Sequence, residues 1–232
     1  MSAMQPLAAG PSPVPSASER IADALRTAIL NGDIKPGEWI RQEDIAERFG
    51  ASRLPVRVAL RILEAEGLTE HTPNRGARVP LLSNHEVSVI YQMRERLEPL
   101  ALIESLPNLS ESDVRDLEAI QQRIESNGDI NTFLALDREF HLLTYQGCEL
   151  EQINSVVSRL WNSTQFYRRA YMSSSYASRI ATVNAEHRLL LDAIVRRDAV
   201  DAERYLVGHI RRTRLELQGD GSPTSAAIDS GD

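Results

Sequence analysis

The fold is decided by a stretch that reads RQEDIAERFGASRLPVRVAL at residues 41–60, LEAEGL at 63–68 and NRGARV at 74–79. This stretch predicts a short helix over residues 43–49 and a longer helix that begins at Ser52 and ends near Gly67, since serine favours helix starts and glycine favours helix ends. Residues 68–80 alternate between apolar and polar side chains around an Asn-Arg-Gly turn, which predicts a β-hairpin.

A further helix is expected upstream of this stretch. Ser18 is its predicted N-cap, and Gly32 is its predicted C-terminal stop. A short extended segment is expected at Trp39 and Ile40. The order helix, short helix, helix and hairpin is that of a winged helix-turn-helix, predicted to occupy residues 18–80.

The longer helix carries arginines at every fourth position, which places them on one face: Arg53, Arg57 and Arg61. A different face is apolar and is expected to hold the helix on its own core: Val56, Leu60 and Leu63. Such helices often read bases with their N-terminal residues, which puts Arg53, Leu54 and Arg57 ahead of Arg61. Taken alone, the arginine face could equally be a solvated surface.

The hairpin favours the DNA-binding interpretation. Arg75 and Arg78 flank Gly76, and glycine allows a tight wing tip to approach DNA closely.

The C-terminal half is predicted to be helical throughout. Apolar residues recur at helical spacing in six segments: 86–106, 112–125, 130–146, 150–171, 178–197 and 199–218. Three consecutive serines at 173–175 separate the fourth segment from the fifth. The expected architecture is mainly α, with an antiparallel all-helical bundle of six or seven helices over residues 83–218. Residues 1–17 and 219–232 are expected to be a disordered leader and tail.

Composition restricts the class of protein. The chain has 232 residues, a net charge of −7 and one cysteine, Cys148, which excludes an internal disulfide. Residues 1–82 contain ten basic and ten acidic side chains, whereas residues 83–232 contain 16 and 23, so the charge permits DNA binding by the N-terminal part. No apolar run is long enough to span a membrane and no secretory signal is visible, so a cytoplasmic protein without membrane contact is expected.

Four side chains in the C-terminal half have the chemistry of metal ligands. Asp137 and His141 share one face of a predicted helix, and His187 and His209 lie on the last two helices. An antiparallel bundle could bring them to one interior point, where three imidazoles and a carboxylate would hold a divalent metal. Hydrogen-bonded core histidines are the alternative.

The quoted stretch resembles the GntR family of transcriptional regulators over residues 20–80, in both motif order and spacing. The resemblance implies a winged helix with Ser52, Arg53 and Arg57 near operator DNA and Gly76 at the wing tip. Two residues depart from the family pattern. Val58 replaces the usual glutamate, and Leu54 replaces a small polar residue, which leaves the base preference open.

Residues 85–215 resemble the FadR-type C-terminal ligand domain, through Asp137-x-x-Phe140-His141, His187 and His209. The resemblance implies an all-helical domain that binds small carboxylates and carries a metal on these residues. Zn²⁺ is the expected ion, with Ni²⁺ and Mn²⁺ as alternatives. Arg94 is similar to an arginine that lines the effector cavity in this domain type, although a structural ion pair with Glu98 is an equal alternative.

Other candidates for the effector cavity are supported only by their position on a plausible helix face: Tyr91, Asn162, Phe166 and Arg169.

The expected function is that of a homodimeric regulator, not an enzyme. A small organic acid would release it from operator DNA, which makes repression the expected mode of control. Two alternatives stay open: a metal-dependent hydrolase or lyase in the C-terminal half, for which Glu186 is the sole neighbouring base, and a regulator that senses the metal ion itself.

Overall fold

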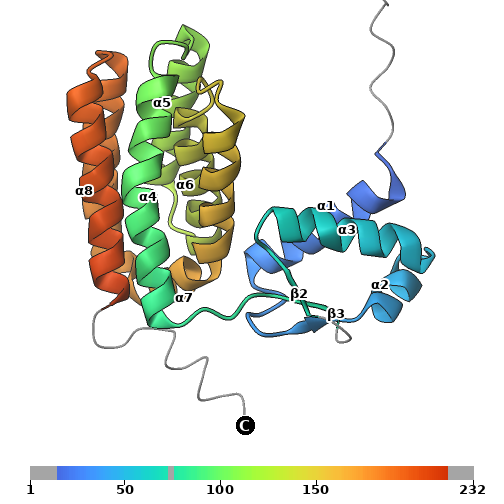
Figure 1. The fold of residues 1–232 in the computed structure, drawn as a ribbon. Helices are drawn as coiled ribbons and strands as arrows, with labels where there is room; N and C mark the ends of the chain where they lie inside the picture. The colour runs from blue at the N-terminus through green and yellow to red at the C-terminus, as the bar shows by residue number, and fades with distance from the viewer. Residues whose placement is uncertain (1–14, 73–75, 219–232) are drawn as a thin grey trace, which may run out of the picture.

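The computed structural model describes residues 15–72 and 76–218. Its N-terminal part, here called the winged-helix region, contains α1 (Ala17–Asn31), β1 (Trp39–Ile40), α2 (Gln42–Arg48), α3 (Arg53–Ala65), β2 (Glu70–Thr72) and β3 (Gly76–Arg78). The strands form one antiparallel sheet in the order β1-β3-β2, so the extended segment predicted at Trp39 and Ile40 is the third strand beside the hairpin. The winged helix-turn-helix predicted from the sequence is confirmed (Figure 1).

The start of α1 corrects the prediction that Ser18 is its N-cap. Ser16 caps the helix instead: its hydroxyl accepts a hydrogen bond from the Glu19 amide at 3.2 Å, and the Glu19 carboxylate accepts one from the Ser16 amide. This reciprocal capping box satisfies two amides at once, which a serine at position 18 could not do with the same glutamate. The predicted stop at Gly32 is confirmed, with a left-handed φ of 81°.

The apolar face of α3 lies in the core of the winged-helix region. Val56, Leu60 and Leu63 are buried against α1, where Ile21 and Leu25 are buried in the same cluster. The arginine face of α3 is exposed. Each face of this helix therefore lies where its side chains predict.

The C-terminal part, here called the bundle, contains α4 (Asn84–Ser105), α5 (Glu111–Ser126), α6 (Ile130–Thr144), α7 (Glu151–Val195) and α8 (Ala199–Leu217). Its core is a second cluster of buried residues, separate from that of the winged-helix region. In Figure 1 the bundle stands beside the winged-helix region, joined to it by the segment that leads into α4. No helix among the described residues is both long and apolar enough to cross a lipid bilayer.

Helix α7 reverses direction within a continuous run of helical turns. A straight helix would place Trp161 and His187 roughly 39 Å apart, at about 1.5 Å per residue. Yet the rings of Trp161 and His187 lie 5.3 Å and 5.1 Å from the ring of His141, so the two limbs of α7 lie side by side. The prediction of two limbs is right, and the predicted break between them is wrong.

The serines at the bend explain why the helix does not end there. The hydroxyl of Ser173 donates to the Arg169 carbonyl and that of Ser174 to the Tyr171 carbonyl, both at 2.9 Å. Serine side chains that bond back to the preceding turn bend a helix without ending it. Five helices thus supply six limbs of the bundle.

Replacing Gly147 by alanine is expected to destabilise the bundle by about 1–3 kcal/mol, because a side chain must be forced into a packed site. A Cβ at this position would overlap the Ser105 carbonyl oxygen, and the Gly147 amide donates to the Ser105 hydroxyl at 2.8 Å. Urea unfolding measures the change. Gly208→Ala is the matched control, because its Cβ would meet nothing within 4 Å. Equal unfolding midpoints for both variants would contradict the steric argument.

Candidate functional site

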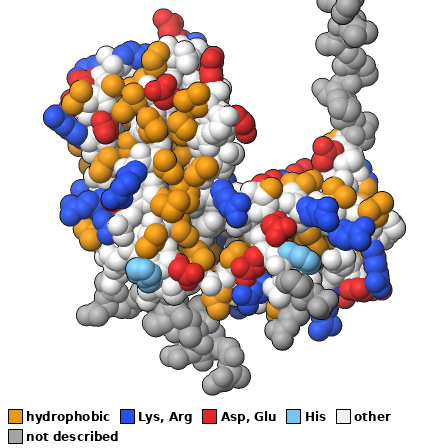
Figure 2. Space-filling model, viewed as in Figure 1, with side chains coloured by type: hydrophobic (Ala, Val, Ile, Leu, Met, Phe, Trp, Pro, Cys, Tyr) orange, Lys and Arg blue, Asp and Glu red, His pale blue; other side chains and the backbone are white. Residues whose placement is uncertain are grey.

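The exposed face of α3 presents three arginines, of which one is paired with a carboxylate. Figure 2 shows Lys and Arg side chains gathered on the winged-helix region, on the side away from the bundle. Among the described residues, no carboxylate lies within ion-pair distance of Arg57 or Arg61, whereas Arg53 pairs with Glu43 at 3.1 Å. Arg57 and Arg61 are therefore free to meet phosphate or a base edge.

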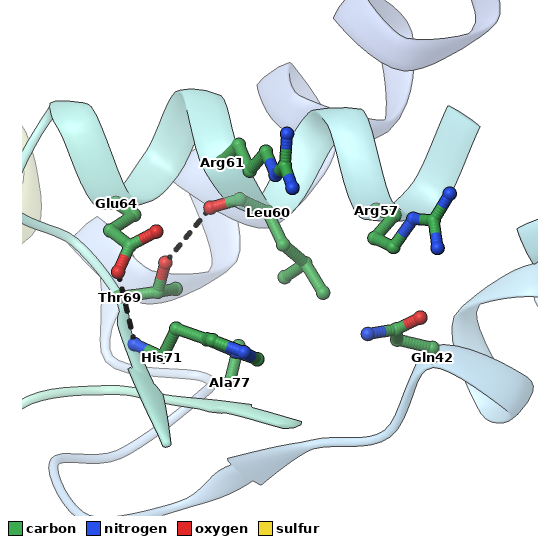
Figure 3. A pocket seen from close by; sticks show the side chains of 8 residues that line it. All are labelled: Gln42, Arg57, Leu60, Arg61, Glu64, Thr69, His71 and Ala77. Carbon is green, nitrogen blue, oxygen red and sulfur yellow. Dashed lines mark hydrogen bonds between the residues drawn. The ribbon is translucent and has the colours of Figure 1, made fainter. Parts of the chain in front are cut away.

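Arg57 and Arg61 border a hollow of about 110 Å³ between α3, α2 and the hairpin. In Figure 3 their guanidinium groups lie on one side of this hollow, with Gln42 from α2 and His71 from β2 on the other. Gln42 and His71 were not singled out from the sequence. The His71 position could have been found from the strand alternation, which places it on an exposed face.

The N-terminus of α3 is left open to an anion. Ser52 is the N-cap, but its side chain makes no capping hydrogen bond and no acidic residue stands in the first turn. By contrast α1, α4 and α5 each begin with a serine and an acidic residue in a reciprocal box. Unpaired amides and the helix dipole at such an end favour a phosphate group.

The remaining predicted DNA-binding residues lie at the start of α3 or on the hairpin. Leu54 is exposed at the start of α3. Gly76 begins β3 with a left-handed φ of 95°, and Arg78 pairs with Glu70 across the hairpin. Arg75 lies outside the described residues.

The four predicted metal ligands converge inside the bundle. Asp137 and His141 come from α6, His187 from the second limb of α7 and His209 from α8. One ligand atom from each lies within 4.8 Å of all the others, and all four residues are buried. The spacing of Asp137 and His141 along one helix face brings them together as the sequence predicts.

These buried groups lack the partners that core residues normally have. Neither ring nitrogen of His141 has a hydrogen-bond partner, nor does Nε2 of His187. The Asp137 carboxylate lies 2.7 Å from the Arg168 guanidinium and 3.6 Å from His187 Nε2. Buried polar atoms without partners are costly, and a cation at the centre of the group would satisfy them. The residues therefore fit a metal ion better than a hydrogen-bonded core.

Two of the imidazoles are oriented by neighbouring side chains. Nδ1 of His187 lies 2.9 Å from Gln121 Oε1, and Nδ1 of His209 lies 2.9 Å from Glu186 Oε2. In both cases Nε2 is the nitrogen left for a metal, as in carboxylate–histidine–metal arrangements. Gln121 was not singled out from the sequence.

Burial keeps the imidazoles of His187 and His141 neutral. It lowers the pKa of His187 to about 3 and holds the pKa of His141 well below its ordinary value. The neutral form carries the lone pair that binds a metal, so both residues can coordinate an ion at neutral pH without first losing a proton.

The predicted effector residues on α7 do not face this cluster. Asn162 donates to the Glu66 carbonyl at 2.9 Å, Phe166 lies in a hollow beside α1, and Arg169 contacts Asn131 and lies against Gly32. The side chains that face the interior are one position earlier, about 100° around the helix: Trp161, Gln165 and Arg168. Each of these three has a buried polar atom without a partner.

The two α4 candidates are both buried. Arg94 forms an ion pair with Glu98, donates to Thr164 Oγ1 at 3.1 Å and lies over the Trp161 ring at 4.0 Å. The structural ion pair weighed for Arg94 is thus present. The Tyr91 hydroxyl has no partner, and burial raises its pKa.

Comparison with known proteins assigns both parts of the chain. Residues 17–79 match the gntR family of bacterial regulatory proteins, and residues 89–212 match the FCD domain. The chain belongs to the GntR family. It is a DNA-binding transcriptional regulator with an FCD domain.

Several bacterial proteins are similar to this chain over most of their length. The HTH-type transcriptional repressor RspR of Escherichia coli (strain K12) is 27% identical over 203 residues, which cover 86% of this chain and 88% of the repressor. An uncharacterized HTH-type transcriptional regulator of Bacillus subtilis (strain 168), YdhC, is 26% identical over 189 residues, covering 80% and 84%. The solved structure of E. coli McbR/YncC has a TM-score of 0.75 at 22% identity, covers 88% of this chain and 99% of that chain, and supports the fold.

Proposed function

We propose that this GntR-family regulator is a homodimeric repressor whose operator affinity is set by a small organic acid, bound beside a divalent metal in the bundle. The observation that carries the proposal is the convergence of four buried ligand groups, in which both nitrogens of His141 and Nε2 of His187 have no hydrogen-bond partner. Asp137, His141, His187 and His209 would hold the metal.

The donor set supports an ion with room for one more ligand. Three imidazole nitrogens and one carboxylate suit Zn²⁺, Ni²⁺ or Mn²⁺, with Zn²⁺ expected for a histidine-rich site. When bound, such an ion would supply a Lewis-acidic contact for a carboxylate oxygen. The chain's own residues would bind the rest of the acid.

Donors for an anionic ligand lie next to the cluster. Arg168 contacts Asp137 and has an unpartnered Nη1, while Trp161 Nε1 and the Tyr91 hydroxyl are also unpartnered. The Trp161 ring lies 5.3 Å from that of His141. These groups are all hydrogen-bond donors, which is the complement of a carboxylate.

The homodimer is supported by an apolar strip on α4. Val89, Met93 and Leu100 are exposed by 39%, 43% and 42%, and they recur at helical spacing along the outer face of the helix. Figure 2 shows a hydrophobic band running along the bundle on this face. A second copy would cover the strip and place two α3 helices on a two-fold operator.

An enzymatic role for the bundle finds little support in the same geometry. Glu186, the neighbouring carboxylate considered as a general base, is bonded to His209 and to Arg212. Both of its oxygens are thus engaged, which disfavours proton abstraction from a metal-bound water.

Removing the metal is expected to lower the melting temperature by about 10 °C. A metal present at about 1,000 times its Kd stabilises the folded state by about 4 kcal/mol, and each kcal/mol shifts the melting temperature of a chain of this size by about 2–4 °C. Native mass spectrometry with elemental analysis identifies the ion, and thermal unfolding with and without a chelator measures the shift. Protein without metal, and with an unchanged melting temperature on adding Zn²⁺, Ni²⁺ or Mn²⁺, would refute the site.

The role of the acid is tested on operator DNA. Fluorescence anisotropy with metal-loaded protein is expected to show weaker operator binding when acetate, succinate or citrate is added singly. Binding that responds to metal but to no carboxylate would instead identify the ion as the signal.

A further inference from the structure

Arg138 is a partly buried arginine next to Asp137 in the sequence, and one nitrogen of its guanidinium has no partner. It follows Asp137 on α6, and its Nη2 donates to Asn162 Oδ1 at 2.6 Å. Its Nη1 is buried and has no hydrogen-bond partner. A buried guanidinium nitrogen without an acceptor is costly, which points to a missing anionic or polar partner.

The charges around Arg138 are unbalanced. The guanidinium carbons of Arg94, Arg168 and Arg138 lie 4.0, 5.8 and 6.0 Å from the Trp161 ring centroid. Arg94 is paired with Glu98 and Arg168 with Asp137. No carboxylate of the described residues lies within ion-pair distance of Arg138. The Glu66 carboxylate acts on Arg138 only from beyond ion-pair distance, and Glu66 is itself bonded to Arg26.

The other end of the contact leads to the DNA-reading helix. Asn162 Nδ2 donates to the Glu66 carbonyl at 2.9 Å, and Glu66 is the C-cap of α3. Carbonyls at a helix end lack partners within the helix, so Asn162 completes this one from the bundle. Arg138, Asn162 and Glu66 therefore form one hydrogen-bonded line from α6 to the end of α3.

We infer that Arg138 is an anion-binding residue of the effector site and that its guanidinium is shared between the bound acid and Asn162. This inference rests on the proposed function, because it assigns a residue of the same site and the route by which that site controls DNA binding. It also gives a role to Asn162, which contacts the winged-helix region and not the metal cluster.

Because one guanidinium contacts both the acid and Asn162, binding of the acid is linked to the position of α3. An acid on Nη1 adds a charge-assisted bond and draws the planar group towards the metal cluster, which changes the geometry at Nη2. The Asn162 amide then holds the Glu66 carbonyl differently, and the orientation of α3 changes with it. Such a coupling is expected to alter operator affinity by about 5- to 150-fold, the usual range for allosteric proteins.

Three variants separate the parts of this line: Arg138→Met, Arg138→Lys and Asn162→Ala. Calorimetry with metal-loaded dimer measures binding of acetate, succinate and citrate, each tested singly, and anisotropy measures operator affinity with and without the acid that binds. Arg138→Met is expected to weaken acid binding at least about tenfold, because it removes a charged hydrogen bond. Asn162→Ala is expected to bind the acid within about threefold of wild type but to lose its operator response.

Arg138→Lys keeps the charge with a single nitrogen, so it should bind the acid and lose the response. This variant also serves if Arg138→Met fails to fold. Arg123→Met, on the exposed side of α5, removes the same charge elsewhere and should match wild type in both assays.

A double-mutant cycle tests the line without any acid. Arg138→Met and Asn162→Ala should each raise hydrogen exchange in residues 61–68, and the double variant should add little, since both break one connection. Additive effects would overturn the connection, and full acid binding by Arg138→Met would overturn its role as a ligand. Wild-type protein that binds none of the acids would instead overturn the proposed function, and with it the ligand role of Arg138.

Discussion

Arg57→Ala is expected to abolish specific operator binding while leaving the dimer intact. Arg57 lies on the exposed face of α3, and no described carboxylate lies within ion-pair distance of it, so its charge is available to DNA. An arginine that contacts a base edge contributes about 1–3 kcal/mol, and a dimer loses two of them. The combined loss is about 2–6 kcal/mol, which is comparable to the margin between specific and non-specific binding.

Anisotropy with operator and with unrelated duplex, over a series of salt concentrations, measures the effect, and size-exclusion chromatography checks the dimer. Arg115→Ala is the control, since Arg115 is an exposed arginine on α5 whose nearest ion-pair contact is 3.8 Å. If Arg57→Ala still prefers operator over unrelated DNA by the wild-type ratio, α3 is not the helix that reads the operator.

The sequence predicted those parts of the structure where one helix face is apolar and the other is polar. On α3 this contrast correctly separates the buried face from the arginine face. The pair Asp137 and His141 was also predictable, since a spacing of four residues puts both side chains on one side of α6. In these cases a local pattern has one consistent solution.

Helix α7 shows where such patterns fail. Its first limb is covered on two sides, by the interior of the bundle at Trp161 and by the winged-helix region at Asn162. Polar residues lie on both covered faces, so neither face differs from the other in polarity and the phase of the helix cannot be read. The predicted effector residues therefore fell one position late, on the face that contacts the winged-helix region. Only tertiary contacts distinguish the face of α7 that lies towards the bundle interior from the face that lies towards the winged-helix region.

His187→Ala is expected to empty the metal site, which is the second large effect. The variant removes one of four ligands and leaves the Asp137 carboxylate buried with fewer partners. The metal content of the purified protein, measured by elemental analysis, should fall from about one ion per chain to a small fraction of that. The effector response should disappear with the metal, whereas operator binding without acid should persist, because α3 and the wing are built on a separate core.

Two further variants distinguish a ligand from a packing residue. His187 is stacked on Phe140 with ring centroids 4.6 Å apart, so its loss also leaves a cavity that lowers stability. Gln121→Ala keeps the ring and removes the partner of its Nδ1, together with the contacts of the Gln121 amide to Glu125 and Asn184. It is expected to weaken metal affinity by about 10- to 100-fold, as for other outer partners of metal ligands. His85→Ala, an exposed histidine at the start of α4, should keep its metal. Because a purely packing role would leave metal affinity unchanged in Gln121→Ala, the graded series tests ligation directly and separates it from loss of folding.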